Sequence, residues 1–166
     1  MGKWLWLLKK IGGNMVNKQT RNIFILSIVL IALFGYLDSM QIIPWQETQL
    51  WEQYNFYVMP AILGMWWIGL LGMSVMYYLI KRDKSEAVGV FISAFIILSG
   101  GTEDVFFFIL SGNVMAQQMC WFTGPQTIIS HLMGEACVSP IALVLNSILF
   151  IILAWYALNW FFKQKW

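Results

Sequence analysis

Apolar residues occur in four long runs along the chain, and short polar segments separate them. In a window of about 19 residues, the runs cover residues 23–43, 57–80, 87–111 and 141–162. Each run is long enough to cross about 30 Å of hydrocarbon as an α-helix. The pattern therefore predicts an all-α integral membrane protein, a bundle of four transmembrane helices in a single membrane domain, residues 1–166.

The third run is less uniform than the others. The six residues from Ser99 to Asp104 are small or polar, and the apolar run resumes only at Val105. Two consecutive glycines at positions 100 and 101 are weak helix formers. We therefore expect the third helix to be kinked or broken there.

Positive charges are confined to three segments of the chain. All ten Lys and Arg residues lie in the N-terminal segment, between Lys81 and Lys84, or in the C-terminal tail. With four spans these segments share one side, which the positive-inside rule assigns to the cytoplasm. We therefore predict cytoplasmic N- and C-termini, with the loops at 44–56 and 112–140 outside, in a protein of the cell membrane.

The composition favours the same class of protein. The chain is 60% hydrophobic and 11% charged, whereas soluble domains carry about 25% charged residues. Its net charge of +2 is too small and too unevenly placed to favour nucleic acid binding. The expected partner is the lipid bilayer, while other membrane subunits or self-association remain open.

Two segments outside the spans are also expected to be helical. Residues 3–12 mix tryptophan, leucine and lysine, which suits a short interfacial helix among anionic head groups. The outer loop, residues 112–140, is long and contains a weakly apolar run at 127–138. We expect this run to form a short helix at the membrane surface, so that the loop is partly helical.

Glu103 and Asp104 are two adjacent carboxylates inside the third span. On a continuous helix they share an arc of about 100° with Gly89, Ser93 and Gly100, so they face the bundle interior. At about 1.5 Å per residue they lie about 10 to 12 Å below the outer end of the span. Two carboxylates at that depth do not both stay ionised without compensation. We expect protons, a cation, a water-filled cavity or donor groups to provide it.

The single histidine suggests a metal site. His131 stands four residues before Glu135, and a helix over 127–138 would place both side chains on one face. Together with Glu103 and Asp104 they would form a carboxylate and imidazole set compatible with zinc, manganese or iron. The cofactor prediction is therefore a divalent metal held by these four residues, or none.

Asp38 lies near the outer end of the first span. In that helix it shares a face with Ser27 and Gly35, and this face could turn toward the same cavity. Asp38 is therefore a candidate to support the site or to complete its ligands. The alternative is a simple interfacial carboxylate.

Cys120 and Cys137 are the only cysteines, and both lie in the outer loop. Outward topology favours a disulfide that clamps the loop. In length, span number and topology the chain resembles the four-helix membrane disulfide oxidoreductases. Their activity needs a CxxC pair in the first outer loop, and residues 44–56 contain no cysteine.

Several small or polar residues in the spans indicate contacts between helices rather than a catalytic or binding role. Ala61, Gly64 and Gly72 form a smooth strip on the second helix, where another helix could approach closely. Asn146 and Ser147 in the fourth helix can hydrogen-bond across the bundle.

Three functions remain open from the sequence. The first is a metal-dependent membrane-embedded enzyme, in which Glu103, Asp104 and His131, with or without Glu135, activate water against a lipid-like substrate. Glu103 or Asp104 would bind the metal, and His131 would act as ligand or general base. The second is a non-catalytic subunit of a larger membrane complex, docked through the small residues and the acidic pair. The third is a proton or cation relay that uses the two carboxylates.

Overall fold

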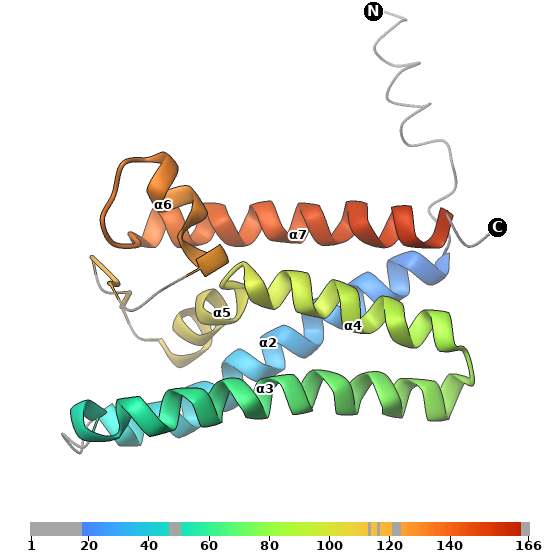
Figure 1. The fold of residues 1–166 in the computed structure, drawn as a ribbon, viewed down its shortest axis with the longest axis horizontal. Helices are drawn as coiled ribbons and strands as arrows, with labels where there is room; N and C mark the ends of the chain where they lie inside the picture. The colour runs from blue at the N-terminus through green and yellow to red at the C-terminus, as the bar shows by residue number, and fades with distance from the viewer. Residues whose placement is uncertain (1–17, 47–50, 113, 116, 121–123, 164–166) are drawn as a thin grey trace, which may run out of the picture.

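In the computed structural model the chain folds into a set of α-helices (Figure 1). The structure describes residues 18–46, 51–112, 114–115, 117–120 and 124–163, with side chains described for residues 18–37, 64 and from 66 onward within these ranges. The predicted interfacial segment, residues 3–12, lies outside the described residues.

Seven helical elements follow one another in the described ranges. They are α2 (Lys18–Gln46), α3 (Trp51–Lys81), α4 (Lys84–Ser99), α5 (Thr102–Ser111), the 3-10 helix η1 (Gly124–Thr127), α6 (Ile128–Leu132) and α7 (Pro140–Lys163). The described residues contain no strand, and extended pairing is limited to one antiparallel bridge between Met119 and Val138.

Two of the helices are long and apolar enough to cross a membrane. They are the Lys18–Leu37 part of α2 and the whole of α7, Pro140–Lys163. A third span is present if α4 and α5, which are bent by 71° at a short break, cross together. This count covers described residues only, and they include side chains from little more than half of α3. The helices are therefore compatible with a membrane protein.

The helices lie side by side and run between two ends of the molecule (Figure 1). Helix α2 packs against α4 and α5, while α4 also packs against α3 and α7. One end holds the start of α2, the turn from α3 to α4 and the end of α7, and the opposite end holds α6 (Figure 1). The described basic residues all belong to the first end: Lys18, Arg21, Lys81, Arg82, Lys84 and Lys163.

The centre of the bundle is apolar, with one polar contact. Its most buried apolar residues come from α2, α3, α4 and α7, and they are Ile31, Leu70, Ala94, Ile97 and Ala154. The hydroxyl oxygens of Ser27 in α2 and Ser93 in α4 lie 2.5 Å apart and are both fully buried. In a membrane, where lipid is as apolar as the core, close packing and such interhelical hydrogen bonds would hold the helices together.

At the charged end, polar side chains fix the start of α4. Asp83 caps the helix, because its Oδ1 accepts hydrogen bonds from the backbone N–H groups of Ser85 (2.8 Å) and Glu86 (3.1 Å). The Glu86 carboxylate accepts a hydrogen bond from the Tyr77 hydroxyl at 2.7 Å and another from the Gln19 side-chain amide. Helices α2, α3 and α4 are thereby joined at one carboxylate.

Candidate functional site

The break between α4 and α5 is the most polar part of the buried interior. The backbone N–H of Gly100 bonds to the carbonyl of Ile97, and that of Gly101 bonds to the carbonyl of Leu98. Gly101 has a φ of +74°, a left-handed conformation that glycine adopts without steric cost. The interruption that the sequence predicted is present, as a full break rather than a kink.

Helix α7 approaches this break closely. A Cβ atom on Gly100 would lie 2.4 Å from Cβ of Phe150, and one on Gly101 would lie 2.8 Å from Cδ1 of Leu143. The Phe150 Cβ is fixed to the backbone of α7 and cannot move aside, whereas the end of the Leu143 side chain can shift. Glycine is therefore needed at position 101 for the left-handed turn and at position 100 for the close contact with α7.

Polar side chains of α7 satisfy groups that the break leaves without helical partners. The Asn146 amide donates two hydrogen bonds through Nδ2, to the carbonyls of Gly100 (3.1 Å) and Pro125 (3.0 Å). The Ser147 hydroxyl donates to Oγ1 of Thr102 at 2.8 Å. Asn146, Ser147 and Thr102 are all buried. Non-helical backbone that is buried away from water requires this kind of internal compensation.

The amide oxygen of Asn146 at the break stays unsatisfied. Oδ1 of Asn146 is buried and has no hydrogen-bond partner among the described residues. Both amide hydrogens are already used by the two carbonyls, which fixes which side of the amide carries the oxygen. A buried acceptor of this kind normally has a partner in the protein, an ordered water or an ion.

The two predicted carboxylates open helix α5. Glu103 is 6% exposed, and Asp104 is half-buried. Oδ2 of Asp104 accepts a long hydrogen bond, 3.4 Å, from the side-chain amide of Gln126 in η1. The partial positive charge at the start of α5 also favours carboxylates in its first turn. Donor groups and the helix terminus thus supply part of the compensation that the sequence required.

The face of α2 that carries Ser27 and Gly35 turns toward α4 and α5. A Cβ on Gly35 would lie 2.7 Å from the carbonyl oxygen of Glu103, so the two backbones are in contact at this point. Asp38, predicted on the same face, belongs to α2. Its side chain lies outside the described set, and its role stays a prediction.

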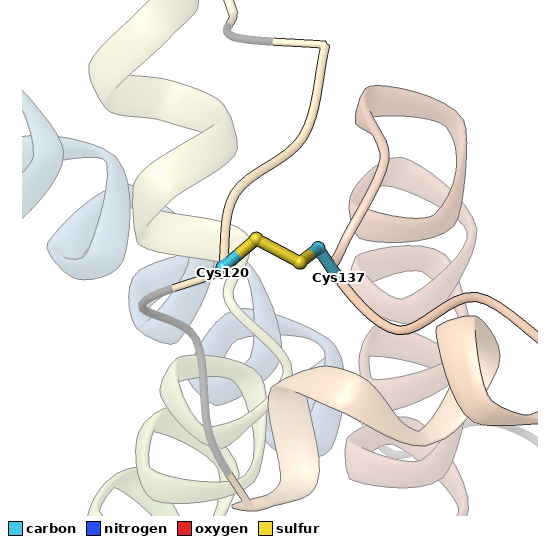
Figure 2. The surroundings of a disulfide bond; sticks show 2 residues. All are labelled: Cys120 and Cys137. Atoms are coloured by element: carbon cyan, nitrogen blue, oxygen red, sulfur yellow. A yellow bond between two sulfur atoms is a disulfide. The ribbon is translucent and has the colours of Figure 1, made fainter.

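A disulfide closes the loop that covers the break. Cys120 and Cys137, separated by 17 positions, are bonded as predicted (Figure 2). Next to them, the backbones of Met119 and Val138 exchange two hydrogen bonds, of 2.9 and 3.3 Å. The closed loop contains η1 and α6, and hence the Pro125 carbonyl that contacts the break.

The predicted helix over 127–138 is shorter in the structure. Helix α6 ends at Leu132, and Gly134 then adopts a left-handed φ of +74° that ends the helix. His131 is exposed, whereas Glu135 lies beyond the turn and accepts a hydrogen bond from the Ser139 hydroxyl at 3.1 Å. The two residues therefore do not share a helical face, as the predicted helix would have required.

The described residues contain no group of three or more His, Cys, Asp or Glu side chains that could hold a metal ion. The structure places Glu103 and Asp104 at the break, and it places His131 and Glu135 on either side of the turn after α6. Binding of zinc, manganese or iron by these four residues stays a prediction.

Sequence reasoning missed the contributions of Pro125 and Gln126. Asn146 and Ser147 were expected to form hydrogen bonds across the bundle, and they do so at the break. Nothing in a single sequence marks the two loop residues, because their contacts with Asn146 and Asp104 exist only after the disulfide-closed loop folds back.

The fold and the site together define a class of protein: an all-helical protein with membrane-compatible helices, one of which is broken at a polar, buried point. Comparison with known protein families, curated proteins and solved structures finds no match.

Proposed function

We propose that the chain is a four-span membrane protein in which α2, α3, the bent α4–α5 pair and α7 each cross the bilayer. The described basic residues share one end of the bundle, which the positive-inside rule would place in the cytoplasm together with both termini. The disulfide-closed loop belongs to the opposite end, which would be extracytoplasmic and oxidising. Charge and redox chemistry thus support the same orientation.

Within this topology we infer that the protein acts as a proton or cation relay. The observation that carries the proposal is the buried Glu103 at the start of α5, directly after a helix break lined by Asn146, Ser147 and Thr102. Carboxylates inside a membrane commonly mark ion or proton pathways. Broken helices at the midplane of transporters supply ion-binding groups in the same way.

Contacts of α2 with α4 and α5 mark a route along which the relay would cross the bundle. The Gln19–Glu86 contact lies at one end, the Ser27–Ser93 pair lies deeper, and Gly35 touches the backbone of Glu103 beyond it. Seven positions separate Glu86 from Ser93, about 10 Å along the helix axis. Apolar side chains fill the gaps, so transfer between these groups would need water molecules.

The geometry favours a relay over a metal-dependent enzyme. The enzyme hypothesis assigned a ligand or base role to His131, which lies exposed on α6. It joined Glu103, Asp104 and His131 at one site, with Glu135 as an optional further ligand, whereas His131 and Glu135 lie on either side of the turn after α6. The relay needs only the carboxylates and the polar groups already at the break.

Flux through proteoliposomes tests the relay. The full-length protein would be reconstituted with a pH-sensitive dye inside, and ion-driven proton movement would be recorded at several cation gradients. We expect Glu103→Gln to abolish flux, because the variant keeps the shape of the side chain but cannot ionise. Glu135→Gln, in the loop, is the matched control and should retain flux. Equal flux in wild-type protein, Glu103→Gln and Asp104→Asn would reject the proposal.

A second candidate function, membership of a larger complex, is favoured by the outer face of α3. Among the described residues, a Cβ atom on Gly64 or Gly72 would meet nothing within 4 Å, and Ile68 between them is 72% exposed. A transmembrane helix of a second protein could approach along these glycines, as small-residue faces allow. Co-purification of a partner from mild detergent that Gly72→Leu abolishes would support this function, and a monodisperse monomer would contradict it.

A further inference from the structure

We propose that the helix break binds one small monovalent cation of the sodium class, with Asn146, Thr102 and Glu103 supplying oxygen ligands. This inference rests on the proposed function, because it names the ion that the same site would take. Three observations carry it: an unsatisfied buried acceptor, the local charge, and the chemistry of the donor atoms.

The first observation concerns Asn146. Its side chain is fully buried, and both hydrogens of its amide are donated to the Gly100 and Pro125 carbonyls. Its Oδ1 is left as a buried acceptor without a partner among the described residues. A buried amide oxygen needs either a donor or a positive charge. The acceptor sits beside the unwound residues, where the backbone is free of regular helical bonding.

The second observation is the charge of the region. Glu103 is more than nine-tenths buried, and Asp104 follows it in the same turn of α5. The chain has no Lys or Arg between Lys84 and Lys163. The break and the loop above it therefore form a negatively charged region. In a low-dielectric setting, these charges attract a cation more strongly than the same charges would in bulk water.

The third observation is the kind of donor atom at the break. Asn146 supplies an amide oxygen, Thr102 and Ser147 supply hydroxyl oxygens, and Glu103 supplies a carboxylate. Oxygen donors without sulfur or imidazole suit hard cations rather than zinc or copper. A divalent ion usually takes several carboxylates, whereas only one carboxylate here is nearly fully buried, and Asp104 is bonded to Gln126. The single negative charge of one carboxylate, together with neutral oxygen ligands, balances the charge of a monovalent ion.

Thermal unfolding of the full-length protein in detergent tests this site. The measurement would compare sodium, lithium, potassium and choline chloride at one ionic strength, with magnesium and calcium chloride as separate arms. We expect Tm to rise with sodium concentration relative to choline, by about 5 °C at a hundredfold excess over Kd. The rise measures binding directly and does not depend on transport.

Variants locate the response. Asn146→Ala, Thr102→Val and Glu103→Gln should each lose the sodium-dependent rise in Tm. Thr102→Val keeps the shape of the side chain, so it remains informative if Asn146→Ala does not fold. Asn159→Ala is the matched control, because Asn159 lies in the same helix and the one hydrogen bond of its side chain to a described residue is with the Trp155 carbonyl one turn away. It should keep the full response.

Each outcome bears on the proposal. Equal Tm values in sodium and choline would mean that an ordered water satisfies Asn146, and they would overturn it. A response to magnesium or calcium alone would also overturn it, as would a sodium response that survives in Thr102→Val and Glu103→Gln. Proton flux without a sodium response would leave the relay standing and reject the ion assignment. A sodium response without any flux would support the ion assignment and reject the relay.

Discussion

Single glycines set how closely the helices of this protein approach one another. Gly35 lets the backbone of α2 touch that of α5, and Gly100 lets α7 pack over the end of α4. In a membrane, where burial against lipid gains little, such contacts provide much of the association energy. Gly64 and Gly72 in α3 have no comparable contact among the described residues, although Gly69 in the same helix faces the Phe34 ring of α2. Glycine content alone therefore does not identify a packing site.

This difference predicts opposite effects for two similar substitutions. Gly35→Ala should destabilise the protein by about 1 to 3 kcal/mol, because the new Cβ would lie 2.7 Å from a backbone oxygen that cannot move aside. Gly72→Ala should be neutral or stabilising by up to about 1 kcal/mol, because alanine favours helix and meets open space. Unfolding in a mixed-detergent titration would measure both. A Gly35→Ala variant as stable as wild type would contradict the close approach of α2 and α5.

At the scale of elements, the disulfide-closed loop and the helix break form one unit. The loop brings Pro125 and Gln126 to the break, where they contact Asn146 and Asp104. The break in turn relies on α7 for its remaining hydrogen bonds. Loosening the loop should therefore affect the polar centre as well as the surface.

The disulfide should contribute about 2 to 4 kcal/mol, as expected for a closed loop of this length. The double variant Cys120→Ser, Cys137→Ser should unfold at lower temperature than the oxidised wild type. Its hydrogen exchange should rise in η1 and at the start of α5, because the loop is no longer clamped near the break. Adding a phosphine reductant should lower the Tm of the wild type and leave the double variant unchanged. Exchange that rises only at the bond itself would show that the loop and the break are independent.

At the scale of the whole molecule, the bend of 71° allows two topologies. If α4 and α5 cross the bilayer together, the turn before α4 and the loop after α5 lie on opposite sides. If they form a re-entrant loop, both lie on the same side. The disulfide and the distribution of basic residues favour crossing.

Labelling with a membrane-impermeant maleimide separates these topologies. In a background without native cysteines, His131→Cys should react in intact cells, and Lys84→Cys should react only after the membrane is permeabilised. Both positions are exposed in the structure, so access to the reagent is not limited by packing. Labelling of both positions, or of Lys84→Cys alone, in intact cells would reject four spans with cytoplasmic termini.

The sequence predicted the features that depend on local composition. Two of its four predicted spans satisfy the length and hydropathy criteria in α2 and α7, and a third does so if the bent pair counts as one. Glycines at 100 and 101 predicted the break, and the two outer cysteines predicted their bond. The helix predicted over 127–138 was too long, because Gly134 ends α6 and separates His131 from Glu135.

By itself, the sequence determined where apolar helices form, where one of them breaks and which end carries the positive charge. These properties follow from hydropathy, glycine propensity and charge along the chain. Only the tertiary structure decided that Asn146 and Ser147 serve the break, that Ser27 meets Ser93, and that the loop returns to Asp104. The physical reason is that these contacts join residues at least 21 positions apart along the chain, and helix packing, rather than local preference, brings them together.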